Sequence, residues 1–290
     1  MDDALKIIDF RCRPPFGRFA TDWMFNLDDI PGHPGLCTKF HKLEVKMPKS
    51  IEEKSMSVFL DEMNEAGIEK AVVPVRKLKT LGNEDLIQLI NEYPDRFIGF
   101  AGAQPLKDGI SQTIEDIDRY IVNGPCTGLF MEPGLDPVPW CIDDEQFFPI
   151  YEKCEQANIP MCLLFGGVFH RLDAPDYSIY LPMRVEHVSR IFPKLKIALT
   201  HAAWPWTIAA CAVAINYENV FLSPDGFMIR HPGAADYIEG ANYRLQDKFI
   251  FGSLYPGLSI EYSVRAYKQL LRPEVWKQVF YENAKRFLEG

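Results

Sequence analysis

The 290-residue sequence lacks the features that define several large classes of protein. Its formal net charge of −9 leaves no basic footprint, which argues against nucleic acid and anionic membrane surfaces as partners. No apolar run approaches the roughly 18 residues that a membrane-spanning helix requires. The start of the chain, MDDALKIIDF, has neither the positive charge nor the apolar core of a secretory signal. We therefore expect a cytoplasmic protein.

Cysteine pairs, phosphate loops and linkers are missing as well. The seven cysteines are an odd number without CxxC spacing, so reduced thiols are expected. The glycines in GLFMEPG and LLFGGV do not follow phosphate-loop spacing, and no nucleotide-binding fingerprint is present. No low-complexity segment divides the chain, which predicts a single domain over residues 1–290.

Apolar and amphipathic stretches alternate regularly along the chain. The apolar runs are nearly continuous, as in strands buried on both faces of a parallel sheet, and each precedes a helix-like stretch. There are eight of them, at 5–11, 70–76, 96–103, 126–133, 159–166, 195–201, 219–224 and 248–254. Eight strand–helix units predict a (β/α)₈ TIM barrel.

Two connecting segments carry their own signals. The long segment 14–49, rich in Pro, Gly, His and aromatic residues, is expected to cover the C-terminal mouth of the barrel. A helix is expected over 50–67. Ser50 and Glu53 have the spacing of a capping box there, and Gly67 stands where a terminal glycine belongs.

The string KIIDFRCRPP at residues 6–15 places two arginines where a strand becomes a loop. Arg11 and Arg13 are one residue apart, so a strand directs both to the same face. Pro14 and Pro15 end the strand because neither can donate a ladder hydrogen bond. Paired arginines are costly to bury without an anionic partner, which favours a ligand site. Ion pairs that anchor an N-terminal strand are the alternative.

Residues that end the strands of a parallel barrel converge on one mouth. Here they include Arg11, Arg13, Arg76, Glu132, His201, Asp225 and Tyr255. Trp206 either walls the same pocket or belongs to the core at a helix start, and His170 lies in the loop after the fifth run. Arginine forks suit carboxylate or phosphate, so a small anionic substrate is predicted.

Four strings together resemble the amidohydrolase superfamily, in its branch of small-acid hydrolases and decarboxylases. They are IIDFRCRPP, FPKLKIALTHAAWPW, KFIFGSLYP and YENAKRFL, and the resemblance covers nearly the whole chain. It implies a TIM-barrel enzyme, typically with a divalent metal, and a possible homodimer.

The resemblance fails at the family's metal ligands. The first-strand His-x-His of the family is Arg11-Cys12-Arg13 here, the eighth-strand Asp is Leu254, and MCLLFGG lacks the strand-5 histidine. Only His201 matches a family polar position directly. Because arginine stays protonated and cannot ligate a cation, no cofactor is expected at the usual site.

A displaced metal site is the alternative to a site without metal. Glu132, His201 and Asp225 are ligand types that suit Zn²⁺ or Mn²⁺. The arginines nearby would oppose a cation there, and they can instead replace the charge of the metal and hold a substrate anion.

Three functional hypotheses follow. By resemblance, the first is hydrolysis of an ester, lactone or amide bond in a small carboxylated substrate. The substrate would be bound by Arg11, Arg13, Arg76, Trp206 and Tyr255, with Asp225 or Glu132 as general base and His201 as proton relay. The second is decarboxylation of an aromatic or unsaturated acid. The third is a non-catalytic protein that binds a small organic anion, although such a binder gains nothing from two carboxylates.

Overall fold

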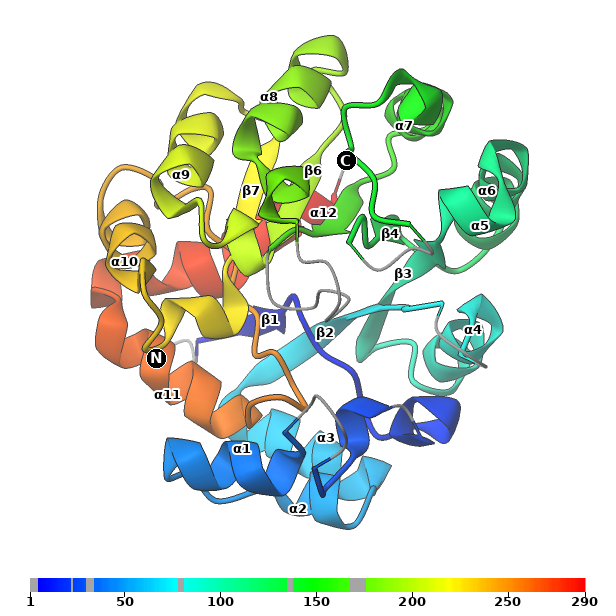
Figure 1. Ribbon diagram of the computed structural model, residues 1–290. Coiled ribbons are helices and arrows are strands. Elements are labelled where there is room, and N and C mark those ends of the chain that lie inside the picture. Colours follow the sequence, from blue (N-terminus) through cyan, green and yellow to red (C-terminus); the bar gives the residue numbers. More distant parts are fainter. Residues whose placement is uncertain are drawn as a thin grey trace.

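The computed structural model describes residues 5–21, 23–29, 34–77, 81–134, 138–166 and 176–289. Seven parallel strands form one sheet in sequence order, and the sheet curls around an axis with helices on its outside (Figure 1). The strands are β1 (Ile7–Asp9), β2 (Ile68–Pro74), β3 (Phe97–Ala103), β4 (Gly128–Met131), β5 (Met161–Leu164), β6 (Ile197–Thr200) and β7 (Val220–Ser223). The predicted TIM-barrel class is confirmed, whereas the count of eight regular strands is not.

The segment that follows residue 247 occupies the eighth position without forming a regular strand. On one side the Leu222 amide of β7 donates to the Lys248 carbonyl, and the Ile250 amide donates back to Leu222, both at 2.9 Å. On the other side the Phe10 amide donates to the Phe251 carbonyl at 2.9 Å. The predicted eighth run therefore bridges β7 and the first strand, with ladder bonds too sparse for a strand.

Most of the helices cover the outer face of the sheet, and none of those in the described ranges is long and apolar enough to cross a membrane. They are α1 (Leu36–Leu43), α2 (Lys49–Glu52), α3 (Met56–Ala66), α4 (Asn83–Glu92), α5 (Pro105–Asp108), α6 (Ile110–Ile117), α7 (Phe148–Gln156), α8 (Pro182–Ile191), α9 (Thr207–Asn216), α10 (Ala234–Asn242), α11 (Ile260–Leu270) and α12 (Asn283–Leu288).

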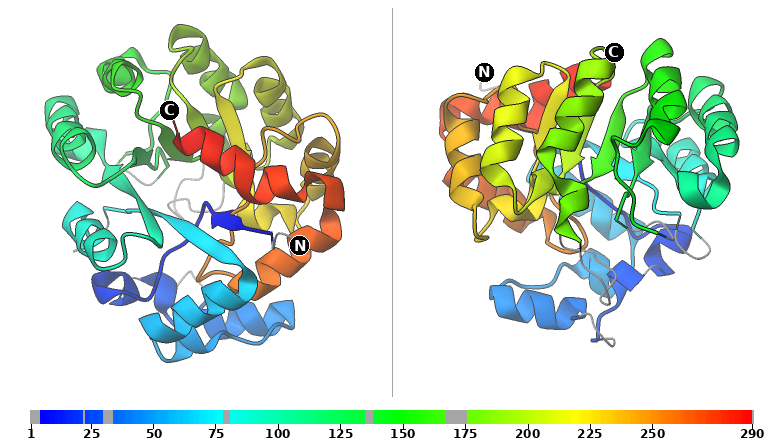
Figure 2. Two further views of the ribbon diagram at one scale, coloured as in Figure 1. Left: turned by 180° about the vertical axis from the view of Figure 1, so that it is seen from behind. Right: turned by 45° about the horizontal axis from the view of Figure 1, so that its top comes forward.

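Strand alternation sorts the buried apolar side chains into an outer layer, between sheet and helices, and an inner cluster inside the barrel. The inner cluster contains Phe10, Val72, Phe100, Phe130, Leu164, Phe221 and Ile250, and its floor is formed by Ala284 and Phe287 of α12. The Phe287 ring lies 5.3 Å from the rings of both Phe10 and Phe221. Seen from behind, α12 crosses this end of the barrel (Figure 2). The interior of the barrel is thus apolar and closed at its N-terminal end, and the polar side chains inside the barrel lie at its C-terminal end.

The described part of segment 14–49 lies at the C-terminal ends of the first two strands. It contains the short 3₁₀ turns η1 (Gly17–Thr21) and η2 (Trp23–Phe25) before α1. The Met24 sulfur is 4.0 Å from a guanidinium nitrogen of Arg76, just beyond β2, and the Phe25 ring is 6.2 Å from the Tyr255 ring. Residues 22 and 30–33 of this segment lie outside the described ranges.

The helix expected over 50–67 is divided in two, α2 and α3. Gly67 ends α3 in the left-handed conformation with φ 79°, as predicted, but the N-cap of α3 is Ser55. The capping box expected at Ser50 is wrong. The buried Ser50 hydroxyl is 2.5 Å from a Glu62 carboxylate oxygen and 2.8 Å from the Tyr255 hydroxyl, so it joins two layers of the fold instead.

Asp9 fastens the first strand to the eighth segment. Its buried carboxylate accepts hydrogen bonds from the Ser253 amide at 2.8 Å, the Ser253 hydroxyl at 2.6 Å and the Arg11 amide at 3.1 Å. Burial raises the pKa of Asp9, while the bonds from Ser253 and Arg11 act in the opposite direction. The closure of the barrel therefore depends on a buried carboxylate that the neighbouring strands satisfy.

We expect Ser253→Ala to lower the free energy of unfolding by about 2 kcal/mol, because the buried Asp9 carboxylate loses a hydroxyl donor. Urea unfolding measures this change. Ser111→Ala, at an exposed position of α6, is the matched control and should change stability by less than about 0.5 kcal/mol. Equal effects of the two substitutions would contradict a role for Ser253 in closing the barrel.

Candidate active site

Three arginine side chains are buried at the C-terminal end of the barrel. Arg11, Arg13 and Arg76 are 1%, 2% and 1% exposed. Arg76 follows from alternation, because Val72 faces the interior and Arg76 lies four residues further along the same face. Arg11 and Arg13 both act electrostatically on the Cys162 thiol of β5, which belongs to the inner cluster. The three charges therefore gather around the mouth.

Arg11 lies deep in this group without a counter-ion bonded to it. Its Cζ is 5.8 Å from the centroid of the Phe130 ring. None of its three guanidinium nitrogens has a hydrogen-bond partner among the described residues, and the same holds for the Ser223 hydroxyl. Desolvation by burial lowers the pKa of Arg11, and the Asp225 charge opposes that effect. A buried charge in this condition is costly unless an anion completes it.

Gly252 makes room for this arrangement. A Cβ at residue 252 would lie 2.9 Å from the Arg11 Cβ, 3.1 Å from the Ser223 hydroxyl oxygen and 3.4 Å from the Asp225 Cβ. The side chains of Arg11, Ser223 and Asp225 thus all approach the Cα of Gly252, where any larger residue would contact them. Ser223 is not singled out by the sequence analysis. The alternation from the inward-facing Phe221 to Ser223 on β7 is the signal that finds it.

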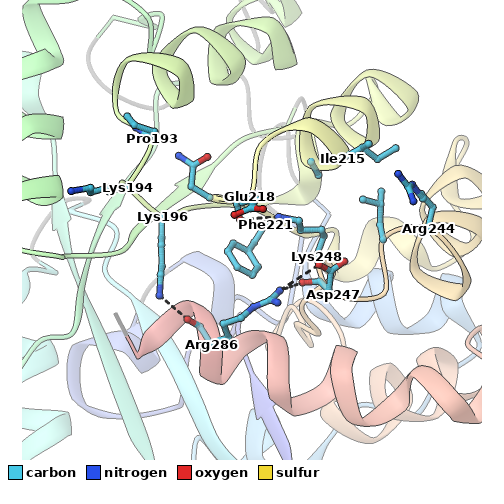
Figure 3. A pocket seen from close by; sticks show the side chains of 13 residues that line it. Pro193, Lys194, Lys196, Ile215, Glu218, Phe221, Arg244, Asp247, Lys248 and Arg286 are labelled. Carbon is cyan, nitrogen blue, oxygen red and sulfur yellow. Dashed lines mark hydrogen bonds and ion pairs between the residues drawn. The ribbon is translucent and has the colours of Figure 1, made fainter.

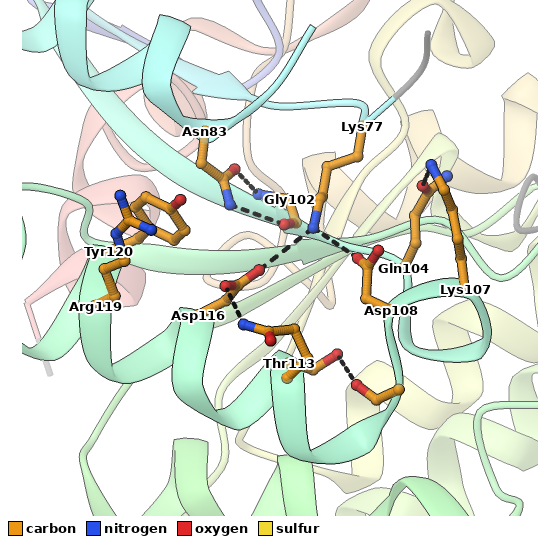
Figure 4. Close-up of polar contacts among 12 residues, drawn as sticks. Lys77, Asn83, Gly102, Gln104, Lys107, Asp108, Thr113, Asp116, Arg119 and Tyr120 are labelled. Carbon is orange, nitrogen blue, oxygen red and sulfur yellow. Dashed lines mark hydrogen bonds and ion pairs between the residues drawn. The ribbon is translucent and has the colours of Figure 1, made fainter. Parts of the chain in front are cut away.

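Glu132 is held by Arg76. The Arg76 Nε donates to a Glu132 carboxylate oxygen at 2.5 Å, and the two side chains are 0% and 10% exposed. Lys77, the next residue, turns away from the mouth. Its Nζ donates to Asp108 at 2.6 Å and to Asp116 at 3.3 Å, between α5 and α6 (Figure 4). Arg76 therefore points into the mouth of the barrel, whereas the next residue, Lys77, forms ion pairs in the helix layer.

His201 and Asp225 form a fully buried pair. The His201 Nδ1 is 3.0 Å from one carboxylate oxygen of Asp225 and 2.8 Å from the other. The two residues follow β6 and β7 with φ of 65° and 44°, in the left-handed region that non-glycine residues seldom adopt. Gly166 permits the approach of β5, since a Cβ there would lie 2.6 Å from the His201 Cβ. Strained backbone of this kind clusters at functional sites.

The surroundings keep the His201 imidazole neutral. Burial lowers the pKa of His201, the Asp225 carboxylate opposes this, and the charges of Arg11 and Arg76 lower the pKa further. The carboxylate oxygens of Asp225 accept hydrogen bonds, so Nδ1 carries the proton and donates it to Asp225. The lone pair of the ring is then on Nε2, which can accept a proton from a reacting group.

The structure does not bring Tyr255 and Trp206 together with these groups. The Tyr255 ring lies 4.7 Å from that of Phe59 in α3, and its hydroxyl is bonded to Ser50, so it faces the helix layer. Trp206 precedes α9, is 38% exposed, and donates from Nε1 to the Tyr177 carbonyl at 3.3 Å.

Two further positions named from the sequence lie near or beyond the site. The Leu254 amide donates to the Arg11 carbonyl at 3.1 Å, so an apolar side chain occupies the position next to Arg11 where the resemblance implies Asp. His170 lies outside the described residues.

Comparisons place this chain in a known family. The sequence model of the family described as Amidohydrolase matches residues 52–290. The chain is 31% identical to an uncharacterized TIM-barrel protein from Bordetella bronchiseptica, with a TM-score of 0.83 over 98% of this chain and 99% of that one. No match is found among curated proteins.

Two more distant structures share the fold. A dihydroxybenzoic acid decarboxylase from a Polaromonas species, with bound manganese and the inhibitor 2-nitroresorcinol, is 16% identical, with a TM-score of 0.65 over 87% of this chain and 93% of that one. A probable 2-pyrone-4,6-dicarboxylic acid hydrolase from Acinetobacter baumannii, with bound citric acid, is 14% identical, with a TM-score of 0.66 over 98% of this chain and 100% of that one.

The residues at the end of β1 do not fit a divalent metal such as the manganese of the Polaromonas structure. At the end of β1 stand the guanidinium groups of Arg11 and Arg13, which have no lone pair to coordinate a cation. Within the described ranges, no three His, Cys, Asp or Glu side chains are grouped so that they could hold a metal ion. The alternative set is divided, because Glu132 is paired with Arg76 while His201 is paired with Asp225.

The depressed pKa of His201 predicts a loss of stability in mild acid. The unfolded chain takes up a proton near pH 6.5 that the folded protein does not, so the stability linked to His201 is complete above about pH 6.5 and declines as the pH falls toward the lowered pKa. The wild type should therefore lose up to about 1.4 kcal/mol per pH unit more than His201→Gln between about pH 6.5 and 5.

Urea unfolding at a series of pH values tests this difference. His41→Gln, an exposed position of α1, is the matched control and should keep the wild-type slope. Identical slopes for the wild type and His201→Gln would contradict a buried neutral imidazole.

Proposed function

Because the chain belongs to the amidohydrolase family, we propose that it hydrolyses an ester, lactone or amide bond in a small carboxylated substrate. It is an enzyme of this superfamily. The observation that carries the proposal is Arg11, a buried guanidinium whose three nitrogens have no hydrogen-bond partner among the described residues. The substrate is the anion that completes it.

Arginine charge takes the place of metal charge in this proposal. A guanidinium over the apolar Phe130 ring and shielded from water acts in a low-dielectric site, where its attraction for a carboxylate or a developing oxyanion is strong. Arg13, buried at the same end of the barrel, adds a second positive charge. The substrate carboxylate and the carbonyl under attack are both oxygen groups that a guanidinium fork matches.

The His201–Asp225 pair supplies the proton transfers. His201 Nε2 accepts a proton from water as the water oxygen bonds to the substrate carbonyl carbon. The imidazolium that forms is stabilised by the Asp225 carboxylate at its Nδ1, and it then donates the proton to the leaving oxygen or nitrogen as that bond breaks. Glu132 holds Arg76 in place and has a positioning role.

Decarboxylation is the second candidate, supported by the decarboxylase among the structural neighbours. In that reaction Arg11 must hold a carboxylate or hydroxyl that stays on the product, because binding the leaving carboxylate would stabilise it in the ground state. Analysis of the products separates the two reactions. Only decarboxylation releases carbon dioxide, and only hydrolysis cleaves an ester, lactone or amide bond to give a carboxylic acid and an alcohol or amine group.

Arg11→Met should lower kcat/KM for carboxylated esters and lactones by about 10² to 10³, because it removes a charge that contacts the substrate anion. Arg119→Met, whose side chain is 67% exposed beside α6, should leave the rate unchanged and is the matched control. Steady-state kinetics on a panel of acids, esters and lactones measures both. Turnover of uncharged substrates alone, or equal rates in the two variants, would contradict substrate binding by Arg11.

His201→Asn should lower kcat by about 10² to 10⁴ with a smaller change in KM, because it removes the proton acceptor and keeps a side chain of similar polarity. The same panel measures this split. Equal kcat in the wild type and His201→Asn would show that the histidine is structural, and the hydrolytic scheme would be wrong.

A further inference from the structure

A second charged cavity lies at the opposite end of the barrel from the candidate active site. It measures about 650 Å³ and is lined by residues that precede β6 and β7 and by α12 (Figure 3). Its charged lining consists of the cations Lys194, Lys196, Arg244, Lys248 and Arg286 and the carboxylates Glu218 and Asp247. This excess of positive charge stands out in a chain with a formal net charge of −9.

Backbone carbonyls, rather than carboxylates, satisfy the lysines at the centre of this cavity. The Lys196 Nζ donates to the Arg286 carbonyl at 2.7 Å, and the Lys248 Nζ donates to the Glu218 carbonyl at 2.8 Å. A carbonyl accepts a hydrogen bond but leaves the positive charge in place. Arg286 has a carboxylate near it, but the Asp247 oxygen is 4.0 Å away, at the limit of an ion pair. The five cations outnumber the two carboxylates of the lining, so positive charge is in excess around the cavity.

The cations are also close to one another. Lys248 Nζ and Arg286 Cζ lie 5.4 Å and 5.2 Å from the centroid of the same Phe221 ring, and Lys196 reaches the backbone of Arg286 (Figure 3). Burial lowers the pKa of both lysines, and the Arg286 charge acts in the same direction. The charges of Asp247 and Glu218 oppose this effect at Lys248, and the charge of Glu289 opposes it at Lys196. An anion placed among the three groups would relieve this repulsion.

We propose that this cavity binds a small organic polyanion that carries phosphoryl groups or several carboxyl groups. Its volume lies within the range of small-molecule sites, about 300 to 1,000 Å³, and exceeds what a single phosphate fills. Pro193 and the half-exposed Ile215 also line the cavity, and their apolar surface suits an organic portion beside the charges. Lysine and arginine together are the side chains that recognise such oxyanions.

Isothermal titration with inorganic pyrophosphate, and separately with citrate, tests the site at low ionic strength. Lys196→Gln and Arg244→Gln should each weaken binding of one or both probes by about tenfold, because each removes a cation from the lining. Arg265→Gln removes an exposed cation from α11, outside the cavity, and should change affinity by less than about twofold. Which probe binds more tightly separates phosphoryl from polycarboxylate recognition.

The Arg11→Met variant distinguishes this cavity from the barrel mouth. Binding that persists in Arg11→Met and weakens in both cavity variants supports the proposal, whatever the reaction in the mouth. Absence of binding by either probe would overturn it. Binding that disappears in Arg11→Met alone would also overturn it, because the anion would then lie in the mouth. Binding that falls equally in Arg265→Gln and in the two cavity variants would overturn it as well, because such a result reflects general charge attraction.

Discussion

The positive charge of Arg11 lies inside the barrel, over the Phe130 ring, with no hydrogen-bond partner for its guanidinium among the described residues. Other features of the mouth depend on it. Burial and the Arg11 charge both lower the pKa of His201, which favours a neutral imidazole. Burial also lowers the pKa of Arg11 itself, and the Asp225 charge opposes that effect. A barrel that served only as a folded scaffold would gain stability from an apolar residue here. The proposed function gives this charge a role, because the bound substrate anion would complete it.

The fold holds Arg11 in place through contacts below it and beside it. Below it, the inner apolar cluster and α12 close the interior of the barrel. Beside it, the Asp9 carboxylate accepts the Arg11 amide and two donors from Ser253, which fixes the end of the first strand against the eighth segment. Gly252 and Gly166 supply the close backbone approach that Arg11 and His201 require. Stability and site geometry thus depend on the same few strand ends.

Much of this arrangement could be predicted from the sequence, because parallel strands obey a simple rule. Nearly continuous apolar runs predict buried parallel strands, and Arg76 and Asp225 follow two of these runs, where the strand ends of a barrel converge. The positions of Ser50 and Tyr255 could not be predicted from periodicity, because tertiary hydrogen bonds determine them. Ser50 has the spacing of a helix cap, yet its hydroxyl is bonded to Glu62 and Tyr255. Tyr255 was expected in the mouth for its position, and the same bond, with the packing on Phe59, directs it to the helix layer.

The most direct test of the account is a crystal structure of the enzyme soaked with a small dicarboxylate, refined together with anomalous data for zinc and manganese. The account predicts a carboxylate with its oxygens about 3 Å from the guanidinium nitrogens of Arg11, and no anomalous peak at the end of β1. A metal ion coordinated near β1, or a dicarboxylate that leaves Arg11 without contact, would contradict the claim that arginine charge has replaced a metal in this barrel.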